Sequence, residues 1–460
     1  MRSPSPALWG LERRGGELWL DGVSLPALAR EHGTPLYAAS ANRLRARAAG
    51  LLGALRAYPR RSRVAFSYKT NLVAGVLQVL HAAGLGAEVV NGYELWLARR
   101  LGVAPEDIVM NGPAKTEAEI AAAVEAGVGL LVMDGLPEIE RVAAEAERQG
   151  RRVRVGLRLC PDVVPRGMNS SSLTGSRRNQ FGLDLQGGEL GAALARLARA
   201  PRLELTALQA HVGSGIHDLA AFRRTASRLL DALAEARARG FSPSCLDLGG
   251  GLGTPASREF TTLELLTYLG TGRLPRRLTP GPQDLLARYG QVLAEAAVSG
   301  ALQRDLPLPE LVLEPGRALV SDAQVLLLGV GAVRERPGVG RFALTDGGAM
   351  STSLMFLSEL HAVLLANREA APDGRTSVFG RVPSPMDLVY RNLPLPRLAP
   401  GDLLAVMDAG AYFTSTASNF GGPRPPVLLL DGGQTRVVRR RERFEDLARV
   451  EEALEGLEPP

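Results

Sequence analysis

The chain has 460 residues, of which 45% are hydrophobic and 22% are charged, and its formal net charge is +6. This composition is typical of a soluble enzyme with a large core, and no apolar run approaches the roughly 20 residues that a membrane-spanning helix needs. The two cysteines are too few for a disulfide framework and lack metal-ligand spacing, so we expect neither disulfides nor a metal site. The first residues lack the apolar core of a secretory signal, and we therefore expect a cytoplasmic protein without a membrane segment.

The positive charge has two interpretations. Its densest run, Val437 to Arg443 (VVRRRER), would suit a nucleic-acid partner. The other arginines are spread through helical segments beside Glu and Asp, which is typical of a solvated surface. We expect a solvated surface and no nucleic-acid partner, with nucleic-acid binding as the alternative.

The predicted elements begin with short strands and one helix in residues 1–34. From residue 35 to residue 320, apolar strand segments alternate with amphipathic helices through about eight units. The strand segments are TPLYAAS, VAFSY, GAEVV, DIVMNG, GLLVMDG, RVRVGLRL, LELTALQAHVG, SCLDLGGG and ELVLEPG. This alternation predicts an α/β fold built on a parallel (β/α)₈ barrel.

After residue 320 the pattern changes to strands joined by Gly-rich turns, with little helix between them. These strands predict a second, mostly antiparallel β domain over residues 321–445, which we expect residues 1–34 to join. Residues 446–460 are predicted to be a C-terminal tail. Residues 255–282, where Pro- and Arg-rich turns flank TTLELLTYL, are predicted to be an insertion.

Lys69 is conspicuous because the chain uses arginine for nearly all of its positive charge. Of its 54 lysines and arginines, only Lys69 and Lys115 are lysines. Lysine has an amine that can lose its proton, whereas arginine stays charged. Lys69 follows an apolar run, and a lysine at the carboxyl end of a barrel strand suits covalent catalysis through a Schiff base. The alternative is a lysine that is merely exposed at the end of a strand.

Three further stretches follow predicted barrel strands. His211 comes directly after one, three consecutive glycines lie in the stretch 247–253, and Glu314 and Arg317 follow the last strand. Taken singly, a histidine or a glycine run after a strand is usually structural. Glycine-rich backbone can, however, close on an anion. Together with Lys69 these stretches supply an amine, a planar ring, a phosphate cradle and a carboxylate, which are the four groups that pyridoxal 5′-phosphate requires.

The chain resembles the fold-type III pyridoxal-phosphate decarboxylases that act on diaminopimelate, ornithine and arginine, with the diaminopimelate group most similar. The resemblance runs from about Gly22 to Leu430. It rests on VAFSYKTN, GAEVVNGYEL, DIVMNGPAKT, LQAHVGSG, LDLGGGLG, LEPGRALV and DAGAYFTSTASNFGGPRPP. It implies a barrel with a C-terminal β domain, as in alanine racemase, with pyridoxal 5′-phosphate as cofactor and decarboxylation of an amino acid as the reaction.

The resemblance also implies roles for single residues. Lys69 would form the Schiff base with the cofactor, and His211 would stack on its pyridine ring. Glu314 would pair with the ring nitrogen and keep it protonated, so that the ring can accept the carbanion left by CO₂. Racemases of this fold offer an arginine at that position, so Glu314 favours decarboxylation.

The remaining implied contacts concern the phosphate and the substrate. The phosphate contacts are Ser214, Gly249, Gly250, Gly251 and Tyr412. Gly316, Arg317 and Asn419 would lie near the cofactor or the substrate. In this family C-terminal residues complete the site across a two-fold interface, so Asp387 and the stretch Asp408–Asn419 imply a homodimer.

Two departures from the family pattern stand out. The family motif GPxCxxxD contains a cysteine that returns a proton to the substrate, but here that position is Pro383, while Asp387 is retained. Proline has no side-chain proton to give, and Ser384 and Lys69 are the candidate donors. The second departure removes an arginine and a tyrosine that bind diaminopimelate, because Ser353 and Leu357 stand at their positions.

We therefore expect a decarboxylase for an amino acid or an amino-acid-derived intermediate other than meso-diaminopimelate. The Arg-rich loop Arg166–Asn179 is a candidate for an anion contact. A racemase, an epimerase or another enzyme of Cα chemistry is the first alternative, because the cysteine is absent. A non-catalytic regulatory homologue is the second, although such a protein would not need Lys69, His211, the glycines and Glu314 together.

Overall fold

The structure is a computed structural model that describes residues 5–168, 172–275 and 285–452. Three predicted segments extend beyond it: residues 169–171 of the Arg-rich loop, 276–282 of the insertion and 453–460 of the tail lie outside the described residues. Among the described helices, none combines the length and the apolar character that crossing a membrane requires.

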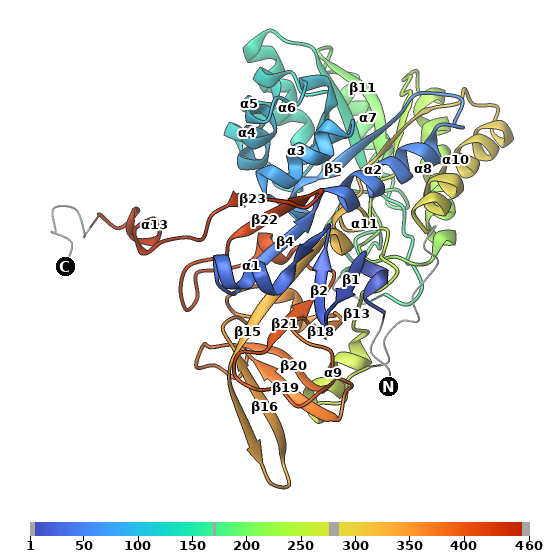
Figure 1. Cartoon of the computed structure of the whole chain (residues 1–460). Helices are drawn as coiled ribbons and strands as arrows, with labels where there is room; N and C mark the ends of the chain where they lie inside the picture. The colour runs from blue at the N-terminus through green and yellow to red at the C-terminus, as the bar shows by residue number, and fades with distance from the viewer. Residues whose placement is uncertain (1–4, 169–171, 276–284, 453–460) are drawn as a thin grey trace.

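Eight parallel strands form a closed barrel, which confirms the predicted fold class (Figure 1). The strands follow the order β9-β11-β12-β14-β5-β6-β7-β8, and β8 pairs with β9 to close the ring. They are β5 (Ser62–Ser67), β6 (Gly86–Val89), β7 (Ile108–Met110), β8 (Leu130–Met133), β9 (Val153–Cys160), β11 (Leu203–Gln209), β12 (Cys245–Asp247) and β14 (Glu310–Leu313). The two-residue strand β10 (Leu183–Asp184) extends the sheet beside β9.

Helices cover the outside of the barrel. They are α2 (Ala41–Leu55), α3 (Ala74–Ala82), α4 (Gly92–Arg100), α5 (Glu117–Ala126), α6 (Leu136–Gln149), α7 (Glu189–Leu197), α8 (Leu219–Ala238), α10 (Leu285–Gln303) and the short α11 (Arg317–Val320). The helix α2 shows why they pack there: Leu44, Ala48, Leu51 and Leu55 recur at helical spacing and are all buried.

A second sheet lies below the barrel in Figure 1. Along it run β20 (Leu388–Leu395), β19 (Gly374–Phe379), β16 (Gly340–Thr345), β15 (Gln324–Arg336), β4 (Leu36–Ser40), β22 (Val427–Asp431) and β23 (Gln434–Arg439), with β18 (Val363–Leu365) and β21 (Leu403–Val406) alongside β15. Its pairs are antiparallel except for β16 with β19 and β4 with β22. Two short helices, α12 (Phe413–Thr416) and α13 (Phe444–Ala448), follow in the same C-terminal part.

One strand lies elsewhere than the sequence analysis places it. Residues 35–40 were assigned to the barrel domain, but β4 pairs with β15 and β22 in the second sheet. All five of its residues are buried, and both of its edges are hydrogen-bonded. The strand–helix pair β4–α2 therefore joins the two domains, because α2 continues directly onto the barrel. An apolar strand followed by a helix is compatible with both positions, which is why the pattern alone misplaced it.

The N-terminal residues pack on the second sheet. The strands β1 (Leu11–Arg14), β2 (Glu17–Leu20) and β3 (Val23–Ser24) form a small separate sheet, followed by α1 (Leu25–His32). Trp9, Leu18 and Leu25 share one buried cluster with Leu327 and Leu364 of the second sheet. The second sheet therefore holds the N-terminal segment through an apolar core of its own.

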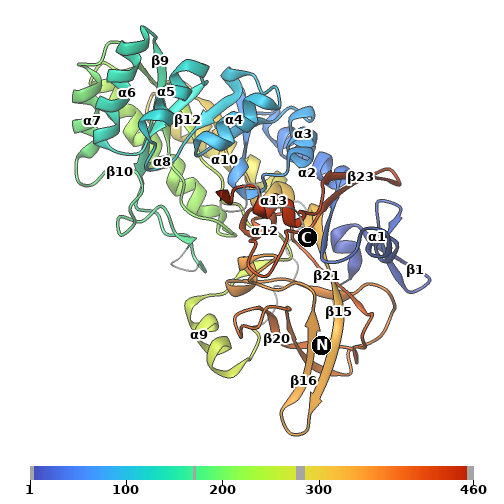
Figure 2. The ribbon, with the colours of Figure 1, turned by 90° about the vertical axis from the view of Figure 1, so that its left-hand side faces the viewer.

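The insertion between β12 and α10 reaches the second domain. Its helix α9 (Thr262–Thr271) lies beside β20 (Figure 2), and the Tyr268 hydroxyl accepts a 2.8 Å hydrogen bond from the Arg391 backbone N–H. Before α9, the two-residue strand β13 (Arg258–Glu259) pairs with β17 (Glu359–Leu360). The insertion thus forms a second link between the domains.

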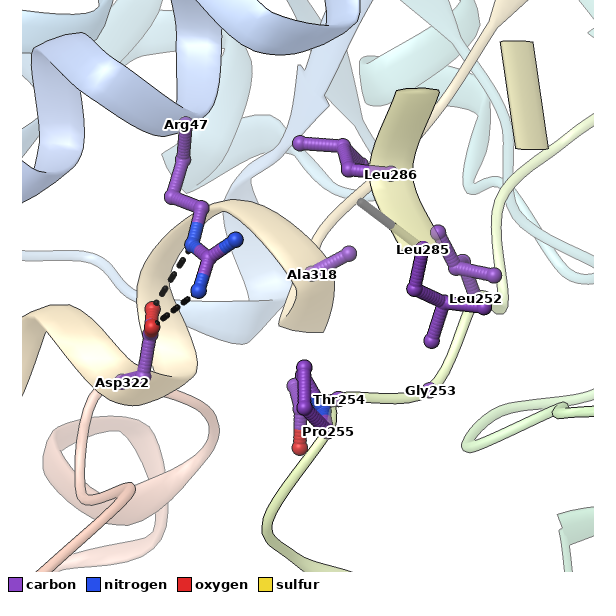
Figure 3. Close-up of a pocket in the computed structure, with 9 residues that line it drawn as sticks. All are labelled: Arg47, Leu252, Gly253, Thr254, Pro255, Leu285, Leu286, Ala318 and Asp322. Carbon is purple, nitrogen blue, oxygen red and sulfur yellow. Dashed lines mark hydrogen bonds and ion pairs between the residues drawn. The ribbon is translucent and has the colours of Figure 1, made fainter. Parts of the chain in front are cut away.

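A buried ion-pair cluster fastens the barrel to the start of the second sheet. Asp322, which is 6% exposed, accepts hydrogen bonds from the guanidinium groups of Arg43 and Arg47 on α2. Figure 3 shows Arg47 reaching from α2 to Asp322 beside a hollow of about 10 Å³, too small for a ligand. Burial raises the pKa of Asp322, but the two arginines outweigh it and the net pKa is lowered.

We expect Asp322→Asn to lower the free energy of unfolding at pH 7 by about 3 kcal/mol, because it leaves two largely buried guanidinium groups without a carboxylate. Since the folded-state pKa lies below the unfolded value of about 3.9, this stability is present above that pH and is lost as the pH falls through the folded-state pKa. Urea unfolding monitored by circular dichroism measures the change.

The matched control is Asp431→Asn, which removes the partner of Arg45 on the same helix. The Arg45 and Asp431 side chains are 48% and 47% exposed, so we expect little change. Equal effects of the two substitutions would contradict the role assigned to burial.

Candidate active site

The direction of side chains along the barrel strands explains where the polar groups gather. A small separate cluster of buried side chains includes Ala65, Val109, Val132, Ala207, Cys245 and Val312. Their strand neighbours, such as Val64 and Phe66, belong instead to the main core against the helices, so the cluster fills the inside of the barrel. Two residues further along, the next inward side chains are polar: Ser67, Asn111, Asp134, Gln209, Asp247 and Glu314.

Three of these side chains, Asn111, Gln209 and Glu314, line a cavity of about 730 Å³ at the carboxyl end of the barrel. Six residues singled out in the sequence analysis line it: Lys69, His211, Ser214, Glu314, Arg317 and Tyr412. Six others that the sequence analysis did not assign also line it: Glu88, Asn111, Arg158, Gln209, Glu259 and Glu359. Asn111 and Gln209 could have been found from the sequence, because every second side chain of a strand points to the same side of the barrel.

Lys69 points into the cavity from the short 3₁₀ turn after β5, η2 (Tyr68–Thr70). Its Nζ donates to the Glu88 carboxylate at 3.0 Å, and 43% of its side chain is exposed. Burial lowers the pKa of Lys69, but Glu88, Tyr412 and Glu314 together outweigh burial and raise it overall. Lys69 is therefore an accessible ammonium group held by one carboxylate.

Lys115 cannot take the same role. Its Nζ is fully buried and donates to the carbonyl oxygens of Gly112 and Val132 and to the Glu138 carboxylate, at 2.8, 2.6 and 2.9 Å. All three of its donors are therefore satisfied inside the protein. Both lysines of the chain lie among the described residues, and Lys69 is the one that lines the cavity.

Glu314 belongs to a buried pair of carboxyl groups. Asn111 Nδ2 donates to its Oε1 at 2.5 Å and Gln209 Nε2 to its Oε2 at 3.0 Å. Burial raises the pKa of both Glu314 and its neighbour Asp247, and that of Asp247 lies well above its usual range. Asp247 therefore holds a proton more readily than an ordinary aspartic acid, and Glu314 is the member of the pair that lines the cavity.

His211 is a neutral ring on the cavity wall. Burial, with smaller effects from Lys69 and Arg158, lowers its pKa to about 3. Its Nδ1 accepts a 3.2 Å hydrogen bond from the Gly250 N–H, so the ring proton lies on Nε2. A neutral, fixed imidazole can stack against a flat ring without adding charge.

The three glycines pack behind His211. A Cβ on Gly250 would lie 2.1 Å from the Glu314 carbonyl oxygen, and one on Gly251 would lie 2.0 Å from the Gly213 carbonyl oxygen. Gly249 and Gly251 also have positive φ angles, of 60° and 94°. Close backbone approach thus requires glycine here. None of these three glycines is among the described residues that line the cavity. Their role in binding the phosphate therefore stays a prediction.

Arg317 lies among the residues predicted to hold the phosphate. Its Nε is 3.4 Å from Ser214 Oγ, and its guanidinium carbon lies 5.2 Å from the centre of the Tyr412 ring. Tyr412 has a positive φ of 64°, and its N–H donates to the Thr70 carbonyl oxygen at 2.7 Å. A non-glycine residue in that region is strained, and the bond to Thr70 fixes Tyr412 beside Lys69.

Besides the three glycines, the predicted site residue Gly316 and three polar ones lie outside the lining of the cavity in the single chain. Asp387 is fully buried and accepts 2.9 Å hydrogen bonds from the Met350 and Val382 N–H groups, so it holds two loops together. Ser384 Oγ accepts from the Met386 N–H at 3.2 Å. Asn419 is exposed, and its Nδ2 donates to Glu442 at 2.6 Å. Their catalytic and substrate-binding roles stay predictions.

The Arg-rich loop contributes hydroxyl groups to the cavity. Ser172 and Thr174 line it, whereas Arg177 pairs with Asp184 and its side chain is 42% exposed. An anion contact by an arginine of this loop stays a prediction.

The residues present fit pyridoxal 5′-phosphate. The cavity offers one accessible amine on Lys69, a neutral ring on His211, a buried carboxylate on Glu314, and a cluster of donors on Ser214, Arg317 and Tyr412. These are the four kinds of group that the cofactor requires.

Comparison with known proteins agrees with this geometry. Residues 46–321 match the sequence family described as pyridoxal-dependent decarboxylase, pyridoxal binding domain. The diaminopimelate decarboxylase of Halalkalibacterium halodurans is 32% identical over 444 residues, which cover 95% of this chain and 96% of that protein. That of Actinosynnema pretiosum subsp. auranticum is 34% identical over 453 residues, covering 96% and 95%.

Solved structures give the same fold. A diaminopimelate decarboxylase from M. jannaschii in complex with L-lysine superposes with a TM-score of 0.83 at 27% identity, covering 98% of both chains. A lysine/ornithine decarboxylase from Vibrio vulnificus in complex with putrescine superposes with a TM-score of 0.69 at 22% identity, covering 88% of this chain and 97% of that one. At that identity the second likeness shows the fold alone.

Proposed function

The chain belongs to the pyridoxal-dependent decarboxylases, and from this premise we propose that it removes the carboxylate of an amino acid other than meso-diaminopimelate. It is a carboxy-lyase that uses pyridoxal 5′-phosphate. When bound, this cofactor withdraws the electron pair that departing CO₂ leaves behind. Lys69 would hold the cofactor covalently, and Glu314 would pair with its ring nitrogen. Ser214, Tyr412 and the glycines at 249–251 would hold its phosphate.

The observation that carries the reaction class is the placement of Lys69 at the mouth of a cavity that ends in a buried carboxylate. Asn111 and Gln209 fix the position of Glu314 by donating a hydrogen bond to each of its two carboxylate oxygens. A racemase of this fold would offer an arginine there instead.

Lys69 is the first candidate for the proton donor. When Lys69 is not bonded to the cofactor, Glu88 holds its Nζ at 3.0 Å and its pKa is raised, so Nζ can deliver a proton inside the cavity without help from Ser384. Ser384 lies outside the cavity of its own chain, so it can serve only if it enters the site of a second subunit.

The proposed substrate follows from the way the cavity would bind a second carboxylate, as meso-diaminopimelate requires. The named relatives are diaminopimelate decarboxylases, which favours that substrate. Against it, Ser353 and Leu357 replace the family arginine and tyrosine, and the Ser353 hydroxyl is bonded within its own loop to the Met355 N–H. Arg317 is held by Glu359 through two hydrogen bonds, and Arg158 is paired with Asp134 at 2.9 Å, so both described arginines that line the cavity already have a carboxylate partner.

The test is CO₂ release from a panel of L- and D-amino acids that includes meso-diaminopimelate. We expect release from at least one monocarboxylic amino acid and none above background from meso-diaminopimelate, because both described arginines that line the cavity are already paired with carboxylates. Lys69→Ala, the control, should release none. Equal turnover of meso-diaminopimelate would refute the substrate proposal.

The same panel of amino acids also tests the main alternative, which is a racemase. If no compound releases CO₂ while Cα–H exchange is seen in deuterium oxide, the reaction is of the racemase type and decarboxylation is wrong for this chain.

We also propose a homodimer with shared active sites. Three apolar side chains of the second domain are exposed: Leu354, Met386 and Phe420 are 44%, 53% and 54% exposed. Met386 is next to Asp387 and Phe420 is next to Asn419, so both flank site residues that do not reach their own cavity. A two-fold interface would bury these side chains and bring the loop 380–387 to the partner's cavity.

We expect sedimentation to give a dimer at micromolar concentration. The double substitution Met386→Asp/Phe420→Asp should raise the dimer dissociation constant at least tenfold, on the order expected for burying two charges in an apolar contact, and should lower activity in parallel. Leu302→Asp on α10, where the side chain is 76% exposed, is the control and should change neither. A fully active monomer would rule out shared sites.

A further inference from the structure

The insertion places a second carboxylate opposite Glu359 in the cavity wall. Glu259 on β13 and Glu359 on β17 are direct cross-strand partners, and both line the cavity. Neighbouring carboxylates across two antiparallel strands repel each other unless a cation lies between or beside them. Arg317 is the cation on this wall.

The guanidinium group of Arg317 pairs mainly with the Glu359 carboxylate. Its Nη1 and Nη2 donate to the two oxygens of Glu359 at 2.8 and 2.6 Å, and its Nε is 3.4 Å from Ser214 Oγ. A two-bond pairing of this kind is the strongest geometry between a guanidinium and a carboxylate. His361 Nε2 lies 3.2 Å from Glu359, and Arg317 and His361 together outweigh burial and lower the pKa of Glu359 to about 2.

Among the described residues, Glu259 has no comparable partner. Its closest approach to Arg317 is 4.0 Å, which is too long for a hydrogen bond. Its described hydrogen-bond partner is the Ser172 hydroxyl, and burial raises its pKa against the opposing effects of Ser172 and Arg317. A buried carboxylate in this position gains more from an added cation than an exposed one does.

We propose that Glu259 is a specificity residue that binds the ammonium group on the side chain of the substrate. The substrate is then an α-amino acid with a second amine and a single carboxylate. This inference rests on the proposed decarboxylase function and names its substrate class. A second carboxylate is disfavoured beside Glu259, because Glu259 and Glu359 repel it and Arg317 is already paired.

Binding of amines to the holoenzyme tests the role of Glu259 without turnover. Calorimetry with 1,4-diaminobutane, 1,5-diaminopentane and n-pentylamine compares two charged ends with one. We expect the diamines to bind about ten- to a hundredfold more tightly than the monoamine, as for a hydrogen bond to a charged group. Glu259→Gln should remove this difference and leave the affinity for the monoamine unchanged.

Glu125→Gln, on the exposed face of α5, is the control and should keep the difference. Equal binding of diamines and monoamine to the unsubstituted protein overturns the proposal, and so does a preference for diamines that survives in Glu259→Gln. The first comparison needs no variant, so it stands even if Glu259→Gln fails to fold.

Measuring CO₂ release distinguishes the role of Glu259 from the decarboxylase function on which it rests. If only neutral or dicarboxylic amino acids release CO₂, the decarboxylase function holds and the assignment of Glu259 is wrong. If no amino acid releases CO₂ but diamines still bind through Glu259, the binding assignment holds and the decarboxylase function is wrong.

Discussion

The ion pair between Lys69 and Glu88 is the interaction on which the site depends. Lys69 must be accessible to react, yet it ends a strand inside a barrel, where an unpaired charge would be costly. Glu88 on the neighbouring strand supplies the opposite charge at 3.0 Å. The same need for partners extends around the cavity, from Glu314 with its amide donors to Arg317 with Glu359. The barrel thus carries several buried charges because each has a partner on an adjacent element.

The second domain takes part in this arrangement. Tyr412 is fixed beside Lys69 by a bond to the Thr70 carbonyl oxygen, and Glu359 reaches Arg317 from β17. The insertion between β12 and α10 adds Glu259 through its pairing with β17. The barrel therefore supplies the groups suited to the cofactor, whereas the insertion and the second domain supply the wall on which we place substrate selection.

Much of this could be predicted from the sequence. Eight apolar strands alternating with helices specify the barrel, and Lys69, His211, Glu314 and Arg317 stand out because each follows one of them. The placement of β4 could not be predicted, since a buried strand before a helix fits either sheet. Glu259 and Glu359 were missed because their meeting depends on a two-residue pairing between segments 100 residues apart, which leaves no local pattern. Asp387 looked catalytic from its motif, but within one chain its carboxylate binds two backbone N–H groups.

The central claim is that Lys69 is the residue that carries the cofactor. Borohydride reduction of the protein loaded with pyridoxal 5′-phosphate, followed by proteolysis and mass spectrometry, tests it directly, because the chain has only two lysines. The structure predicts a pyridoxyl group on the peptide that contains Lys69 and none on the peptide that contains Lys115, whose amine is buried and fully hydrogen-bonded. A stoichiometric label on Lys115, or a label that persists in Lys69→Ala, would contradict it.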